Sequence, residues 1–265
     1  MNGVEIVTTD ADAYYLVTTP DEHYEQIRTM LIEGKHVLCE SPIASSGKEC
    51  KELFELAKKQ KCVLMEGIKT AYSTAYSRLL LLAKSGEIGK IVSVDATCTS
   101  MRDDLDSLEN KWNSISAWGP TALLPIFQLL GINYTDKKII SHYIDDDKMF
   151  DGFTKIDFIY PDSVASIKVA KTAKSEGELI ITGTKGYIYV PAPWWKTDYF
   201  EIRYEDPTEN KRYFYKLDGE GIRYEIVAFN RSIESGKNYS YIDSKISIAI
   251  SEIIEACKSN NVIEI

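Results

Sequence analysis

Asp12-Ala13-Tyr14-Tyr15-Leu16-Val17-Thr18-Thr19-Pro20 is the stretch that decides the fold. Its apolar run at 14–17 has the length of a buried strand. The next four residues, Thr19-Pro20-Asp21-Glu22, are a helix start, with a hydroxyl cap, proline at the first position and glutamate three residues after the cap. A buried strand that leads directly into a helix is typical of an α/β fold.

The same unit then repeats along the chain. Apolar runs at 36–39 and 62–65 are the next two buried strands, and Ser46-Gly47-Lys48-Glu49 is a second capping box between them. Strand–helix–strand–helix–strand with short connections predicts parallel pairing and right-handed crossovers.

After Gly89 the period of the sequence changes. Apolar and polar residues alternate at 92–98, 153–160, 164–169, 178–182, 187–190, 199–204 and 211–217. This alternation is typical of half-exposed antiparallel strands. Two closing helices are expected to bury the stripes Ile222, Ile226, Phe229, Ile233 and Ile246, Ile250, Ile253.

The composition excludes several function classes. A net charge of -9 argues against a nucleic-acid partner, because phosphate contacts need a basic face. No apolar run is long enough to span a bilayer, so no membrane partner is expected. The five scattered cysteines form no pair or cluster with histidine, which predicts no metal site and a reduced, cytoplasmic setting.

Several strings resemble the Gfo/Idh/MocA family of NAD(P)-dependent oxidoreductases. They are, in order, residues 12–20, Gly34-Lys35-His36-Val37-Leu38-Cys39-Glu40, Met65-Glu66-Gly67, Gly86-Glu87-Ile88-Gly89, the helix at 119–131, and Gly183-Thr184-Lys185-Gly186. The resemblance implies a partial Rossmann-like nucleotide domain at 1–91 and an α+β substrate and oligomerisation domain with a mostly antiparallel open sheet at 92–265.

The resemblance also implies ligands. It implies NAD or NADP as cofactor, a small sugar-like substrate, and a homo-oligomer, either a dimer or a tetramer. The cofactor-binding residues that it implies lie in two turns, namely Thr19, Pro20 and His23, and Glu40, Ser41 and Pro42.

The chain departs from the family pattern at the phosphate-binding loop. No Gly-x-Gly-x-x-Gly occurs, and only eleven residues precede Asp12, whereas the βαβα portion that carries this motif needs roughly 60. The strand at 14–17 is therefore expected at or near a sheet edge. Either residues are missing from the sequence, or something else covers that edge.

The family's reactive positions are also altered. Its Glu-Lys-Pro is Glu40-Ser41-Pro42 here, and its Asp-x-Gly-x-His pattern maps onto residues 117–121, with Ala117 and Thr121 at the reactive places. Ser41 is short and neutral, so it cannot supply the electrostatic effect of the family's lysine, and Thr121 is neither a proton acceptor nor a donor near neutral pH. We hypothesise that Lys69 replaces the lost lysine charge, helped by Tyr72; the alternative is an ordinary surface lysine.

An aromatic group gives the sequence a second candidate feature. Trp194 and Trp195 are adjacent, and on a strand they would point to opposite faces. They either pack the sheet or form a platform for a sugar ring, and Trp112 and Asn113, with Lys111, are candidates for the same pocket.

Two functions follow. The first is an NAD(P)-dependent oxidoreductase that acts on a sugar, a polyol or a related carbonyl compound. The second is a catalytically silent family-derived module that binds a sugar-like ligand or a partner subunit, which the altered Ser41, Ala117 and Thr121 favour. The presence or absence of cofactor binding separates them.

Overall fold

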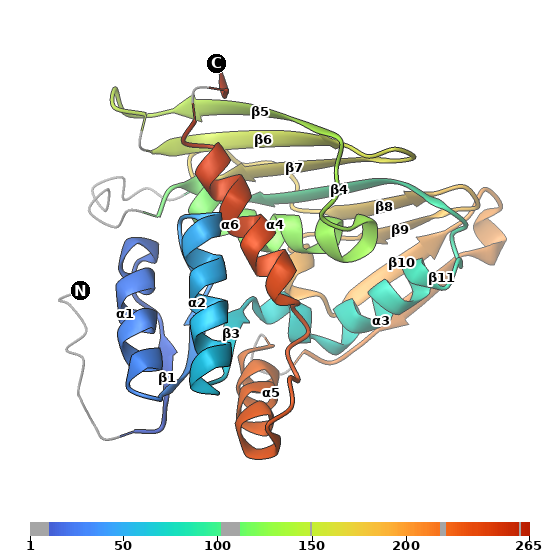
Figure 1. Ribbon diagram of the computed structural model, residues 1–265. Helices are drawn as coiled ribbons and strands as arrows, with labels where there is room; N and C mark the ends of the chain where they lie inside the picture. The colour runs from blue at the N-terminus through green and yellow to red at the C-terminus, as the bar shows by residue number, and fades with distance from the viewer. Residues whose placement is uncertain (1–10, 102–111, 149, 218–220, 260) are drawn as a thin grey trace.

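The computed structural model describes residues 11–101, 112–148, 150–217, 221–259 and 261–265. Its strands form a three-stranded parallel sheet in the order β1-β2-β3 and a nine-stranded sheet in the order β11-β10-β9-β8-β4-β7-β6-β5-β12 (Figure 1). The predicted fold class, a small parallel sheet followed by a larger and mostly antiparallel one, is confirmed.

The small sheet is built as strand and helix in alternation. Its elements are β1 (Ala13–Leu16), α1 (Pro20–Ile32), β2 (His36–Glu40), α2 (Gly47–Gln60) and β3 (Leu64–Gly67). β1 and β3 both pair in parallel with β2, and β1 lies at the edge as expected. Ile27, Leu31, Val37 and Leu53 are buried at its core, which explains the apolar spacing of the helices.

The two predicted helix N-caps are confirmed in position but not in hydrogen bonding. Thr19 and Ser46 are the N-cap residues of α1 and α2 and have extended backbone, but neither hydroxyl makes a capping hydrogen bond. The prediction of where each helix begins is therefore confirmed, whereas the predicted hydroxyl bond is wrong.

The rest of the chain forms the large sheet and its helices. In chain order these elements are η1 (Lys69–Tyr72), α3 (Thr74–Lys84), β4 (Ile91–Thr99), α4 (Ser114–Leu130), β5 (Asp136–Tyr143), β6 (Asp151–Ile159), β7 (Val164–Ala170), β8 (Leu179–Gly183), β9 (Tyr187–Val190), η3 (Trp194–Lys196), β10 (Tyr199–Arg203), η4 (Pro207–Glu209), β11 (Lys211–Phe214), α5 (Ile222–Ser235), α6 (Ser244–Ala256) and β12 (Ile263–Glu264).

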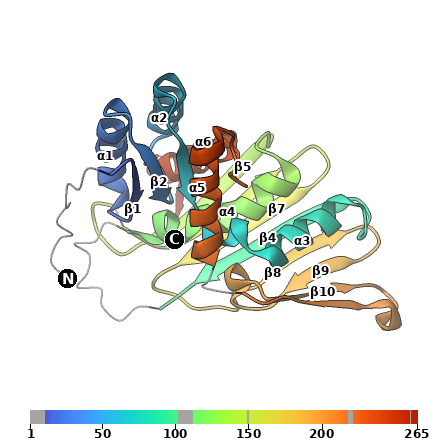
Figure 2. The ribbon, with the colours of Figure 1, turned by 90° about the horizontal axis from the view of Figure 1, so that it is seen from below.

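The helices join the two sheets. α3 and α4 lie along one face of the nine-stranded sheet (Figures 1 and 2), and α6 packs against both α2 and α4. β4 differs from the prediction, because it pairs antiparallel with β8 but in parallel with β7. This central place buries Val94, Ala96 and Cys98 under the helices.

Helix α5 buries a different face from the predicted stripe. Ile226 is 38% exposed, whereas Glu225, Ala228, Phe229 and Ser232 are buried. These four residues follow helical spacing and face the end of the small sheet, where β2 contacts α5. Glu225 and Ser232 thus lie on the inner face of α5, and the predicted burial of Ile226 is wrong.

Two substitutions in α5 test this assignment of its faces. Phe229→Ala is expected to lower the free energy of unfolding by about 3 kcal/mol or more, since it deletes a buried ring. Ile226→Ala is expected to cost less than about 1 kcal/mol, because much of that side chain already meets solvent. Urea unfolding followed by circular dichroism measures both, and equal losses would contradict the assignment.

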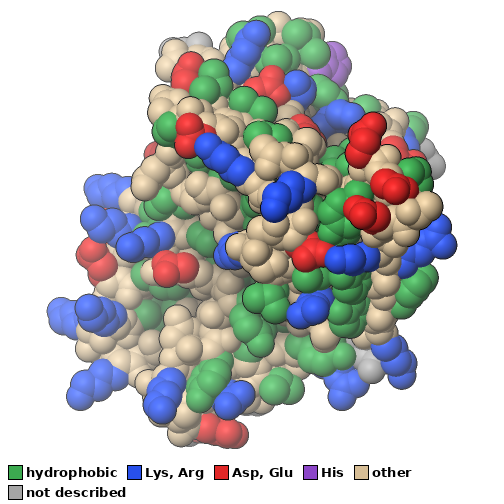
Figure 3. Space-filling view, turned by 90° about the vertical axis from the view of Figure 1, so that its right-hand side faces the viewer, with side chains coloured by type: hydrophobic (Ala, Val, Ile, Leu, Met, Phe, Trp, Pro, Cys, Tyr) green, Lys and Arg blue, Asp and Glu red, His purple; other side chains and the backbone are tan. Residues whose placement is uncertain are grey.

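The surface mixes charge types. On the face drawn in Figure 3, lysine and arginine side chains are interspersed with aspartate, glutamate and hydrophobic ones. Among the described residues, no helix is long and apolar enough to cross a membrane. No group of three or more histidine, cysteine, aspartate or glutamate side chains in that part of the chain could hold a metal ion.

Candidate functional site

A pocket of about 400 Å³ lies where β2 and β3 end at the carboxyl edge of the small sheet. Glu40 and Gly67 are the last residues of these two strands and are paired in register. The pocket is lined by Glu40, Ser41, Gly67, Ile68, Lys69, Thr70, Trp112, Ala117, Trp118, Pro120, Thr121, Trp195 and Lys196. Ligands of open α/β sheets bind at this edge, so the pocket is the candidate active site.

The two turns expected to hold the cofactor are tied together by His23. This buried ring lies with Nδ1 2.7 Å from the Pro42 carbonyl oxygen and Nε2 2.9 Å from the Thr18 carbonyl oxygen. A carbonyl can only accept, so at least one ring N–H donates, and both donate in the doubly protonated ring. Thr19 and Pro20 open α1 beside it, and His23 thus has a structural role in fixing both turns.

Ser41 is held by a buried carboxylate. Its hydroxyl donates to Oε1 of Glu66, a fully buried residue of β3 whose pKa is raised by burial. On β1, the Tyr15 hydroxyl donates in the same way to the Glu40 carboxylate. Both residues of the Glu40-Ser41 turn are therefore anchored by side-chain hydrogen bonds.

Lys69 is one of the two lysines that line this pocket, together with Lys196. It is half-buried in η1, and no hydrogen-bond or ion-pair partner is found for its Nζ among the described residues. Ala117 and Thr121 face the same pocket from the first turns of α4. The structure thus brings Ser41, Lys69 and Thr121 to one pocket, although they lie 28 and 52 residues apart along the chain.

Aromatic rings also line this pocket. The Trp118 and Trp195 ring centroids lie 5.0 Å apart, and the Trp118 Nε1–H donates to the Ser100 hydroxyl over 3.2 Å. The Thr70 hydroxyl donates to the Trp195 carbonyl oxygen over 2.8 Å, which joins η1 to η3. Trp112 lines the pocket as well. Such rings can stack on the apolar face of a sugar.

Two of the expected substrate contacts, Trp194 and Asn113, do not line this pocket. Trp194 is completely buried beneath Trp195 in a short 3-10 helix, not on a strand, and its Nε1–H donates to the Thr97 carbonyl oxygen over 3.0 Å. Asn113 is buried as the N-cap of α4, where its side chain accepts from the Ser116 N–H. Lys111 lies outside the described residues.

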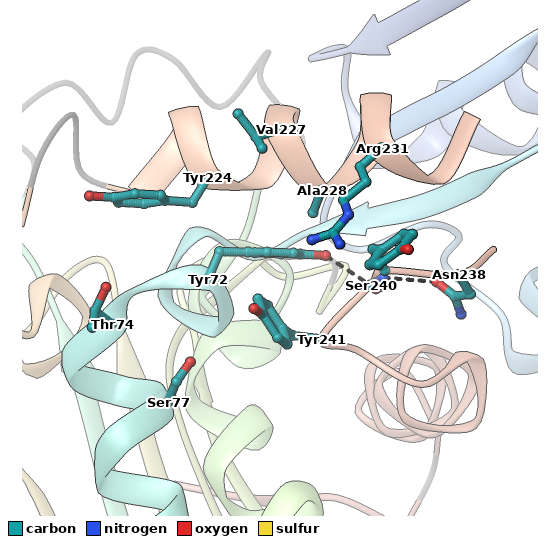
Figure 4. A pocket seen from close by; sticks show the side chains of 11 residues that line it. Tyr72, Thr74, Ser77, Tyr224, Val227, Ala228, Arg231, Asn238, Ser240 and Tyr241 are labelled. Carbon is teal, nitrogen blue, oxygen red and sulfur yellow. Dashed lines mark hydrogen bonds between the residues drawn. The ribbon is translucent and has the colours of Figure 1, made fainter. Parts of the chain in front are cut away.

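Tyr72 lines a second pocket, of about 500 Å³. Figure 4 shows its ring between α5 and the start of α3, with the hydroxyl toward Ser240, 3.1 Å away. Tyr241 packs against it with ring centroids 5.3 Å apart. Tyr72 and Lys69 thus line different pockets, and the expected help of Tyr72 to Lys69 is not seen in the pocket lining.

Glu225 is the residue that the sequence reasoning missed. It is buried on the inner face of α5, and its Oε1 would lie 2.9 Å from a Cβ built on Gly67. Its spacing of three and four residues from Ala228 and Phe229 was the available signal, because it places a carboxylate on a buried helix face.

Comparisons with known proteins agree with this fold. The model of the Gfo/Idh/MocA family, described as "Oxidoreductase family, NAD-binding Rossmann fold", matches residues 3–68. Scyllo-inositol 2-dehydrogenase (NADP(+)) of Bacillus subtilis (strain 168) is 40% identical over 76 residues, which are 28% of this chain and 23% of that protein. The match therefore spans less than a quarter of that relative.

Two longer comparisons extend over nearly the whole chain. Trans-1,2-dihydrobenzene-1,2-diol dehydrogenase of Oryctolagus cuniculus is 24% identical over 257 residues, which are 92% of this chain and 76% of that protein. A 3-ketoreductase from Actinomadura kijaniata, solved with TDP-benzene and NADP, superposes with a TM-score of 0.83 at 17% identity and covers 98% of this chain and 80% of that one. The predicted resemblance to the Gfo/Idh/MocA oxidoreductases is confirmed. These names give no support to the alternative of a silent module.

Proposed function

We propose that this relative of the Gfo/Idh/MocA oxidoreductases is an NAD(P)-dependent oxidoreductase that acts on a sugar, a polyol or a related carbonyl compound. The observation that carries the proposal is the pocket at the carboxyl edge of the small sheet, where Ser41, Lys69 and Thr121 converge. The cofactors and substrates in the names of its relatives point to the same class.

The residues present fit the nicotinamide end of the cofactor. The turns at Thr19-Pro20 and Glu40-Ser41-Pro42 follow two adjacent parallel strands, and His23 holds them together at the edge where dinucleotides bind. When bound there, the nicotinamide would exchange a hydride with the substrate. The backbone and side chains of these two turns would orient it toward the pocket.

Lys69 is the proton-exchanging group in this proposal. As an amine it takes the hydroxyl proton when an alcohol is oxidised, and as an ammonium it returns a proton when a carbonyl is reduced. Thr121 and Ser41 have hydroxyls that neither gain nor lose a proton near neutral pH, so they can only orient substrate hydroxyls by hydrogen bonds. Trp118 and Trp195 would stack on the sugar ring.

Cofactor binding tests the proposal. All four tryptophans of the chain lie in the pocket wall or directly under it, so bound NADPH or NADH should quench their emission by energy transfer. Titration of the folded protein with each cofactor, followed by turnover of scyllo-inositol with NADP+, measures this. A folded protein that binds neither cofactor would contradict the proposal. The expected homo-oligomer and cytoplasmic location stay predictions.

A further inference from the structure

Glu225 places an unpartnered carboxylate behind the wall of the candidate active site. The residue is 0% exposed, and neither carboxylate oxygen has a hydrogen-bond partner within the described part of the chain. A Cβ on Gly67 would lie 2.9 Å from Glu225 Oε1, so this carboxylate occupies the space that the glycine leaves. Gly67 itself lines the pocket. The carboxylate is therefore packed directly against the pocket wall.

Asp151 shows what a structural carboxylate looks like in the same protein. It is also buried, but it accepts hydrogen bonds from the Ile115 N–H at 3.1 Å and from the Thr154 hydroxyl at 2.6 Å, and it anchors the start of α4. Burying a carboxylate without such bonds is costly. Glu225 is buried without such bonds and anchors no element by a side-chain hydrogen bond among the described residues. A buried polar group of this kind calls for a functional explanation.

The charged groups around Glu225 come from β2, β3 and η1. Burial is the main cause that raises the Glu225 pKa from about 4.5 to about 8. Glu40 and Glu66 raise it further, and Lys69 opposes them. Tyr15 and Tyr72 also interact electrostatically with this carboxyl. At neutral pH the carboxyl is therefore mostly protonated, within electrostatic range of a lysine that has no hydrogen-bond or ion-pair partner among the described residues.

We propose that Glu225 is a positioning residue that stores a proton for Lys69. The inference rests on the proposed oxidoreductase function and deepens it, because it names the group that restores the lysine after each turnover. Glu225 lies behind Gly67 and outside the pocket lining, so it acts through Lys69 and not on the substrate.

The proton balance in the reducing direction is as follows. The carbonyl carbon accepts a hydride from the reduced nicotinamide, so a C–H bond forms and the C=O π bond breaks. Lys69 gives a proton to the oxygen, which completes the alcohol and leaves a neutral amine. The amine then turns toward Glu225, to which it is not hydrogen-bonded in this structure, and takes the proton of the carboxyl. The resulting carboxylate takes a proton from water after product release. In the oxidising direction each transfer is reversed.

Glu225→Gln tests the storage role, because the amide has nearly the same shape but cannot release a proton at these pH values. We expect kcat to fall about tenfold or more, with KM little changed. The pH profile of kcat should lose its inflection near pH 8, and Glu225→Asp should restore part of it. Glu234→Gln, on the exposed face of the same helix, is the control and should keep the wild-type profile. A wild-type profile in Glu225→Gln would overturn the proposal.

A second measurement needs no substrate. A carboxyl whose pKa is raised in the folded state stabilises the protein at pH values below the pKa of the unfolded state. This stabilisation is lost as the pH rises through the pKa of the folded state. The Tm of Glu225→Gln minus the Tm of the wild type should therefore increase between about pH 4.5 and 8. A difference that is the same at every pH would overturn the inference even in an active enzyme. A pH-dependent difference without any turnover or cofactor binding would instead overturn the proposed function.

Discussion

Replacing Lys69 by methionine is expected to lower kcat by about 10²- to 10⁴-fold for whichever sugar or polyol the protein turns over, the usual range for loss of an acid–base group. Methionine keeps much of the length and apolar stem of lysine but has no exchangeable proton. Ser41 and Thr121 cannot replace it, because a hydroxyl does not change protonation near neutral pH. Steady-state absorbance of the reduced nicotinamide measures the loss.

Two further variants separate chemistry from packing. Lys84→Met, at the exposed end of α3, removes a lysine far from the pocket and should leave turnover unchanged. Lys69→Arg keeps the positive charge but holds its proton too tightly to exchange it, so it should remain close to the methionine variant in kcat. NADPH titration should give similar affinity in all three. Full turnover in Lys69→Met would show that Lys69 is an ordinary surface lysine.

The fold was predictable where one face of an element is apolar. The buried runs at β1, β2 and β3 and the stripe at Ile27 and Leu31 specify the parallel unit locally. The parallel pairing of β4 with β7 was not predictable in this way, because it joins residues about 70 positions apart and a half-buried strand carries no sign of its partner's direction.

The candidate site was likewise predictable from the sequence only in part. Ser41 and Thr121 were found from motif position, and Lys69 from its place after a strand, since strand ends converge in a parallel sheet. Glu225 reaches the site from the other end of the chain. Burial of Glu225 in place of Ile226 contradicts the apolar stripe, and only the missing side chain of Gly67 makes room for it.

Trp194 and Trp195 are adjacent but are expected to respond in opposite ways to substitution. Trp194→Ala should lower the free energy of unfolding by about 3–5 kcal/mol, because it empties a fully buried site. It also removes the only donor that Trp194 offers to the Thr97 carbonyl oxygen, which adds an unsatisfied buried acceptor. Trp195 is only half-buried, so Trp195→Ala should cost clearly less stability.

The effect on ligand binding should run the other way. Trp195 lines the pocket and packs on Trp118, so Trp195→Ala is expected to weaken sugar or polyol binding in a protein that remains folded at assay temperature. Trp194→Phe keeps a large ring in the core and should bind ligand like the wild type while losing part of the stability. Urea unfolding measures the stability of the three variants, and KM reports their substrate binding. A larger stability loss in Trp195→Ala than in Trp194→Ala would reverse the two roles, and would make Trp194 the platform that the sequence first suggested.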